Sequence, residues 1–138
     1  MLAAGAAYFV LGGLWYSPLL FAKDWMAEMR LSLEQIEAAK GRGMGRIFAA
    51  TFALGLLMAF VLALLLQARG AEAVQGRDVW RAALSGGEIG LLVSLGFAAT
   101  TTATNYLYER CSPRLFLINA GYPAVGGFVV GLILGAWR

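Results

Sequence analysis

Four long apolar segments, separated by charged connections, dominate the pattern of the chain. Residues 1–22, 47–68 and 115–137 carry no charge, and residues 82–108 carry only one, Glu88. A helix needs about 20 apolar residues to cross about 30 Å of hydrocarbon. The pattern therefore predicts an all-α fold, an integral membrane four-transmembrane-helix bundle.

The first apolar segment could instead be a signal peptide. It lacks a preceding basic stretch and a clear small-x-small cleavage site. Trp15 and Tyr16 stand near its far end, where interfacial aromatic residues are common. We therefore expect a retained helix. A single membrane domain is expected over residues 1–138, with spans at about 2–22, 47–67, 83–107 and 115–137.

The longest connection, between helices one and two, predicts a short amphipathic surface helix. Ser32 followed by Gln35 fits a capping box, in which each residue's side chain accepts from the other's backbone N–H. Gly41 and Gly43 stand where a helix over residues 33–40 would end. The third connection is very short, which predicts that helices three and four form an antiparallel hairpin.

Composition supports a lipid surrounding. Hydrophobic residues make up 60% of the chain and charged residues only 14%, whereas soluble domains carry about a quarter charged residues. The net charge is +3, but the basic residues lie between the apolar segments, where they fit loops facing anionic head groups. We expect the lipid bilayer as a partner, and no nucleic acid.

Cysteine and histidine usage limits the chemistry. The chain has no His, and Cys111 is its single cysteine. An intrachain disulfide, a Cys/His zinc site and a His-based triad are therefore excluded. We expect no cofactor, no metal and no catalytic residues, so the protein is not expected to be an enzyme, and Cys111 is expected to be a bystander.

Basic residues also predict the orientation. The first and third connections share one face, and the termini and the second connection share the other. The first face carries seven basic residues and the second carries four: Lys23, Arg30, Lys40, Arg42, Arg46, Arg110 and Arg114 against Arg69, Arg77, Arg81 and Arg138. Because basic loops stay in the cytoplasm, we expect both termini outside.

Small residues recur every fourth position in three of the predicted helices. Such ladders allow close helix packing where lipid removes the hydrophobic driving force. They pack helices either within one subunit or between copies in a homo-oligomer, and the pattern leaves both open. The ladders comprise Gly127, Gly131 and Gly135 in helix four, Gly55, Ala59 and Ala63 in helix two, and Gly86 and Gly90 in helix three.

Helix three is unusually polar. At 100° per residue, Ser94, Thr101 and Asn105 fall on one stripe. Helix four contributes Asn119 and Tyr122, and a hairpin places Asn105 and Asn119 at equal depth. We therefore expect these two side chains to face one another.

Two prolines add polar backbone near the same face. Pro123 removes the helical partner of the Asn119 carbonyl, and Pro18 does the same to that of Leu14. The resulting cluster is either a set of interhelical clamps or a small polar pocket for a solute, ion or lipid head group. Its predicted members are Trp15, Tyr16, Ser17, Thr101, Asn105, Asn119 and Tyr122.

Glu88 is the one charge inside a predicted span, and such residues are functional candidates by default. It lies only seven residues after Arg81, in the first turns of helix three. A carboxylate there can reach the interface or pair with Arg81. We favour that role over proton coupling.

Several patches resemble the domain-of-unknown-function 1761 family. Residues 12–21, with Trp-Tyr-Ser-Pro, resemble its opening, and residues 118–122, Ile-Asn-Ala-Gly-Tyr, resemble a later patch. The resemblance covers essentially the whole chain and implies a small bacterial four-helix membrane protein with no implied activity. A His is common in the family after the second patch, where this chain has Pro123, and in or after helix three, where Tyr106 follows Asn105.

These expectations leave two functional hypotheses. The first is a non-enzymatic structural or assembly module that self-associates or docks on a larger membrane complex. It is expected in the cell membrane, which the resemblance implies is the bacterial cytoplasmic membrane. The second is a small transporter or channel for a small solute or ion, with a polar pocket between helices one, three and four. A dry, hydrogen-bonded cluster favours the first hypothesis, and a water-filled crevice favours the second.

Overall fold

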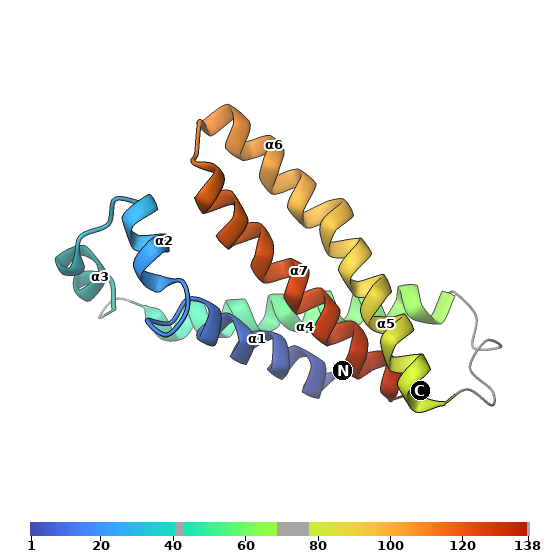
Figure 1. The fold of residues 1–138 in the computed structure, drawn as a ribbon. Coiled ribbons are helices and arrows are strands. Elements are labelled where there is room, and N and C mark those ends of the chain that lie inside the picture. Colours follow the sequence, from blue (N-terminus) through green and yellow to red (C-terminus); the bar gives the residue numbers. More distant parts are fainter. Residues whose placement is uncertain (41–42, 69–77, 138) are drawn as a thin grey trace.

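The computed structural model describes residues 1–40, 43–68 and 78–137 and is all-α in this part of the chain (Figure 1). The continuous helix Val79–Glu109 contains a π-helical segment, η2, between α5 and α6. The elements are α1 (Leu2–Trp15), α2 (Ala22–Glu28), α3 (Leu33–Lys40), α4 (Met44–Ala68), α5 (Val79–Val93), η2 (Ser94–Ala99), α6 (Thr100–Glu109) and α7 (Pro113–Ala136).

The long helices form two antiparallel pairs that cross each other (Figure 1). α1 runs beside α4, and the continuous α5–α6 helix runs beside α7. The tight hairpin predicted between helices three and four is confirmed. Arg110 ends α6 in the left-handed conformation, and the Ser112 side chain caps α7 by accepting from the Leu115 N–H. Pro113 suits the first turn of α7, where no N–H is needed.

In the described residues, three helices are long and apolar enough to span a membrane: α4, α5–α6 and α7. The first predicted span falls short. α1 has 14 residues, which at about 1.5 Å per residue give about 21 Å, against about 30 Å of hydrocarbon. The prediction of four full spans is therefore met by three helices and not by α1.

The early end of α1 has a local cause. Ser17 and Pro18 form a turn directly after Tyr16, because Pro18 cannot donate a helical hydrogen bond. The Ser17 N–H and Oγ–H both donate to the Leu14 carbonyl, at 3.1 and 2.7 Å. Ser17 thus supplies the Leu14 carbonyl with the partner that Pro18 cannot provide, and the chain turns away and continues as α2.

A short helix is present where the sequence predicts one, as α3, with the predicted bounds. The Ser32 N–H donates to the Gln35 side chain at 2.9 Å, and the Gln35 N–H donates to Ser32 Oγ at 3.2 Å. This confirms the capping box. Gly41 and most of the second connection lie outside the described residues, as do Arg42, Arg69, Arg77 and Arg138 of the charge comparison.

Glycines bring the backbones of α5 and α7 into direct contact. A methyl group on Gly86 would collide with the carbonyl oxygen of Gly131, and one on Gly131 with that of Gly86. The same holds for Gly90 and Gly127, one turn further along. Gly135 meets the backbone of Ala82 in the same way. The glycine ladders of helices three and four therefore pack against each other within one chain.

The ladder of α4 faces α1 and the core. Ala59 is fully buried, together with Ala4 of α1 and Val130 of α7. The ring of Tyr8 occupies the space beside Gly55 of α4 and Gly126 of α7. The Tyr8 side chain of α1 thus contacts both α4 and α7, and it does so at glycines because a larger residue at either position would crowd the ring.

We predict that Gly86→Ala lowers the thermal stability of the purified protein in detergent. The added methyl group has no room against the Gly131 carbonyl, and overpacking of this kind costs about 1–3 kcal/mol. Gly96→Ala is the matched control, because nothing lies within 4 Å of its added methyl group. Equal melting temperatures for the two variants would contradict the close α5–α7 contact.

Candidate functional site

The side-chain amide of Asn119 lies at the centre of a polar cluster. The Tyr16 hydroxyl donates to Asn119 Oδ1 at 2.9 Å, and Asn119 Nδ2 donates to the Tyr106 hydroxyl at 2.7 Å. The amide thus connects three elements: the C-terminal end of α1, the last turns of α6, and α7. All three side chains are partly buried.

Two further bonds join α1 to α7. Trp15 Nε1 donates to the Ile118 carbonyl at 2.9 Å, and the Tyr122 hydroxyl donates to the Tyr8 carbonyl at 3.2 Å. The Tyr122 ring packs on Tyr8, with centroids 4.8 Å apart, and edge-on to Tyr16 at 5.7 Å. Polar and aromatic contacts therefore connect α1 and α7 along two turns.

The structure brings together four of the seven predicted cluster residues, Trp15, Tyr16, Asn119 and Tyr122. Ser17 instead bonds its own turn. Thr101 and Asn105 are exposed and take no part, so the expected Asn105–Asn119 pairing is wrong. The sequence did not predict the roles of Tyr8 and Tyr106. The one indication for Tyr106 was that the resembling family often has a His in or after helix three, where this chain has Tyr106.

The π-helical segment explains why Tyr106 replaces Asn105. The predicted stripe assumed 100° per residue from Ser94 onward. A π-helix places its hydrogen bonds between residues i and i+5, which adds about one residue to the turn. Compared with an uninterrupted α-helix, the residues after Ala99 therefore face about 100° away from the predicted direction, which corresponds to a shift of about one residue. Ser94 is buried at the start of the segment, and the partly buried positions of α6 are Thr102, Ala103 and Tyr106, whereas Thr101 and Asn105 are exposed.

α7 continues through Pro123 as one helix. The proline weakens the local backbone ladder, and Trp15 donates to the Ile118 carbonyl, next to the Asn119 carbonyl that the sequence analysis singled out. One turn before Pro123, residues at the end of α1 thus bond the Ile118 carbonyl and the Asn119 side chain. Pro18 lies outside any helix, in the turn after α1.

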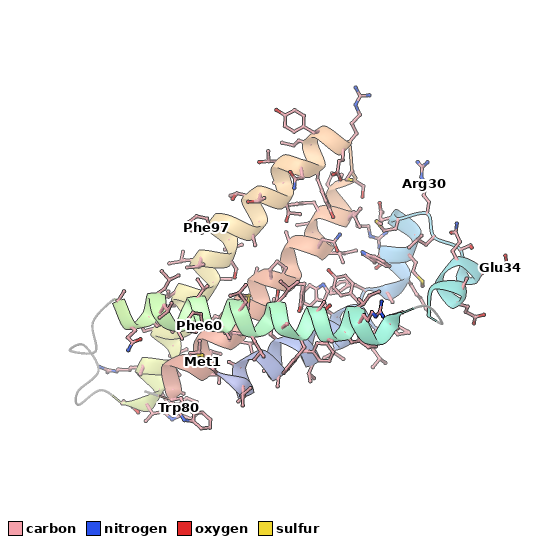
Figure 2. All side chains as sticks on the ribbon, turned by 180° about the vertical axis from the view of Figure 1, so that it is seen from behind. Met1, Arg30, Glu34, Phe60, Trp80 and Phe97 are labelled. Carbon is pink, nitrogen blue, oxygen red and sulfur yellow. The ribbon has the colours of Figure 1, made fainter. Side chains whose placement is uncertain are left out.

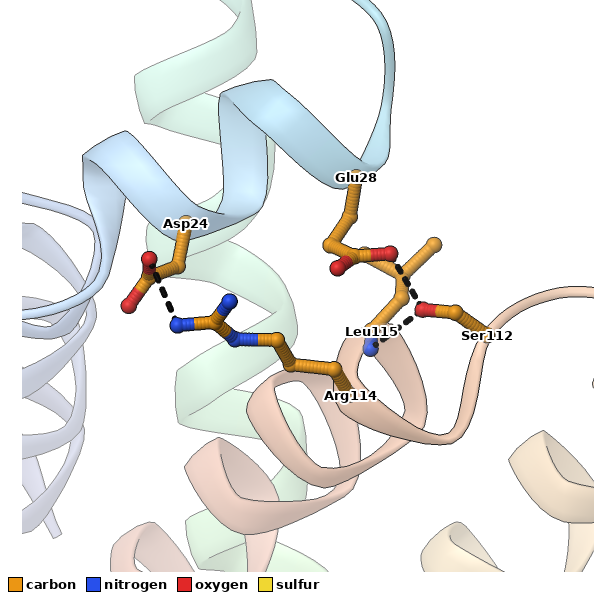
Figure 3. A network of polar contacts seen from close by, with 5 residues as sticks. All are labelled: Asp24, Glu28, Ser112, Arg114 and Leu115. Atoms are coloured by element: carbon orange, nitrogen blue, oxygen red, sulfur yellow. Dashed lines mark hydrogen bonds and ion pairs between the residues drawn. The ribbon is translucent and has the colours of Figure 1, made fainter.

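α2 is fixed to the start of α7 by two polar contacts (Figure 3). Arg114 Nη2 lies 2.9 Å from Asp24 Oδ1, and the Ser112 hydroxyl donates to the Glu28 carboxylate. The same Ser112 oxygen caps α7 at Leu115. The ion pair is largely exposed, so it contributes about 0–1 kcal/mol, and its effect is to orient α2 over the hairpin.

The remaining candidates lie apart from the cluster. Glu88 is exposed on the side of α5 away from the glycine contact and makes no ion pair with a described residue. Of its two expected roles, the pairing with Arg81 is therefore absent, and a position at the membrane interface stays a prediction. Cys111 lies in the hairpin loop, where desolvation and the nearby Glu109 carboxylate raise the pKa of its thiol. In the described residues, no three Cys, Asp or Glu side chains gather closely enough to hold a metal ion.

The sequence pattern of one family, described as "Protein of unknown function (DUF1761)", matches residues 1–135. The chain belongs to this family. The match covers both sequence patches that suggested the resemblance, and those patches supply Trp15, Tyr16 and Asn119 to the cluster. No curated protein and no solved structure matches the chain. Family membership therefore supplies no activity, and the site has to be interpreted from its geometry.

We predict that Asn119→Ala lowers the melting temperature in detergent, because it removes two interhelical hydrogen bonds. Such bonds contribute about 0.6 kcal/mol each in membrane proteins, so the loss should be about 1 kcal/mol. Asn105→Ala is the matched control, since Asn105 is exposed on the same helix as Tyr106. Equal destabilisation by both substitutions would contradict the assignment of Asn119 as the centre of the cluster.

Proposed function

We propose that this protein is a non-enzymatic membrane module that acts through assembly, with α4 as its docking face. In this proposal the polar cluster is a structural clamp, and the functional surface lies on α4, which contributes no side chain to that cluster. A second copy of the chain is the first candidate partner, and a larger membrane complex is the other.

The internal bonding of the cluster supports the clamp. Each polar side chain at its centre already has a partner within the chain: Tyr16 on Asn119, Asn119 on Tyr106, Tyr122 on the Tyr8 carbonyl and Trp15 on the Ile118 carbonyl. A transport path for a solute or ion needs polar groups that are free to exchange partners. The transporter hypothesis therefore gains no support from this geometry.

The observation that carries the proposal is the poor cover of α4. Within the chain it packs mainly on α1, and Figure 2 shows it lying in front of the other helices when the molecule is seen from behind. Leu54 and Leu57 are 65% and 56% exposed. Gly45, Ala49 and Ala53 form an exposed row of small residues at four-residue spacing, which allows another helix to approach closely.

Cysteine cross-linking in membranes tests this face. Cys111→Ser removes the only cysteine, so a single new cysteine reports on one position. In a two-fold dimer a residue near the axis meets its own copy at equal depth. We expect Ala53→Cys to form a disulfide-linked dimer under mild oxidation, with a doubled native mass in nanodiscs.

Phe97→Cys is the control, because Phe97 is 73% exposed but lies on η2 rather than on α4. It should remain uncross-linked. A cross-linked product larger than the dimer, seen with Ala53→Cys and not with the control, would indicate a different partner on the same face. Monomeric protein with no product at Ala53→Cys would overturn the proposal.

The proposed orientation places the α6–α7 loop in the cytoplasm and both termini outside, following the distribution of basic residues. Cys111 is a natural reporter of this loop. We expect a membrane-impermeant maleimide to leave Cys111 unlabelled in intact cells and to label it after permeabilisation, faster as the pH rises, because its raised pKa leaves little thiolate at neutral pH. Equal labelling rates in intact and permeabilised cells would show that the loop faces the outside, which contradicts the proposed orientation.

A further inference from the structure

A groove of about 390 Å³ lies between α1 and α4, with Tyr122 of α7 at its inner wall. Its size falls within the range of small-molecule sites, about 300–1,000 Å³. Gly13 leaves open space there, since nothing lies within 4 Å of an added methyl group. The groove is lined by Phe9, Gly12, Gly13, Tyr16, Ile47, Phe48, Thr51 and Tyr122.

The lining selects against a charged ligand. None of its eight residues is ionisable at neutral pH, and moving an ion out of water without a counter-charge costs far more than a neutral hydrogen bond returns. Four of the residues are aromatic: Phe9, Tyr16, Phe48 and Tyr122. A neutral molecule with a flat ring fits walls of this kind.

The hydroxyl groups of the lining select for a hydrogen-bond donor. Thr51 Oγ1 donates to the Ile47 carbonyl at 2.8 Å, and the Tyr122 hydroxyl donates to the Tyr8 carbonyl at 3.2 Å. The Tyr16 hydroxyl donates to Asn119. Each hydroxyl has one hydrogen and two lone pairs, so all three can still accept and none can still donate.

We propose that this groove binds a neutral, ring-bearing amphiphile that carries a hydroxyl donor, of the phenol or hydroquinone class. Hydrocarbon offers such a donor no acceptor, whereas the groove offers an acceptor beside aromatic walls. The site is separate from the Ala53 face proposed for assembly, and neither proposal depends on the other.

Two probes that share the same ring and propyl chain test the donor requirement. 4-Propylphenol carries the hydroxyl, and its methyl ether keeps the oxygen but has a methyl group in place of the donated hydrogen. Binding is measured by saturation-transfer NMR on the protein in nanodiscs, with empty nanodiscs subtracted to remove partition into lipid. We expect saturable binding of the phenol about fivefold tighter than that of the ether, the effect of one neutral hydrogen bond.

Gly13→Leu tests the location, because its side chain extends into the groove without meeting protein atoms at its base. It should reduce binding of both probes to the level of empty nanodiscs. Gly96→Leu, also with open space around it and far along the chain in η2, should bind as the parent does. If Gly13→Leu fails to fold, as judged by its melting temperature, Gly13→Ala serves instead and should weaken binding at least twofold.

Three results would overturn the proposal. One is equal affinity for the phenol and the ether, which would leave an apolar groove without donor selection. Another is no saturable signal above that of empty nanodiscs. The third is unchanged phenol binding in a folded Gly13 variant, which would place the probe elsewhere on the protein.

Discussion

The direct backbone contact between α5 and α7 is the constraint on which the other helix positions depend. Apolar side chains gain little by leaving lipid for one another, so helices there associate through close contact and hydrogen bonds. Gly86 and Gly90 meet Gly131 and Gly127 with no side chain between them. This contact fixes the hairpin as one rigid unit, and the hairpin in turn presents Gly126 and Tyr122 to α1.

The second unit, α1 with α4, attaches to the hairpin through different chemistry. Tyr8 fills the space that Gly55 and Gly126 leave open, and the Asn119 cluster holds the end of α1 a few turns away. Small residues thus determine how closely the helices pack, and polar side chains determine their register. α4 shares the first kind of contact through Gly55 and Ala59, but it contributes no side chain to the hydrogen bonds around Asn119, and its Leu54 and Leu57 remain exposed.

Much of the fold is predictable because its signals are local. Charge spacing marked α4, α5–α6 and α7, and Ser32 with Gln35 marked α3. The end of α1 was missed because charge counts do not register the Ser17-Pro18 turn. The partner of Asn119 was missed because a π-helical turn has no simple sequence signal, and one such turn changes the face of every later residue. The centre of the cluster, Asn119, can therefore be predicted while its partner Tyr106 is replaced by the neighbouring Asn105.

The unequal lengths of the helices have a consequence for the bilayer itself. α1 is about 21 Å long, whereas the continuous helix Val79–Glu109 has 31 residues and measures about 46 Å at about 1.5 Å per residue. A bilayer meeting both must thin beside one and thicken beside the other, or the long helix must tilt, at fractions of a kcal/mol per Å of mismatch.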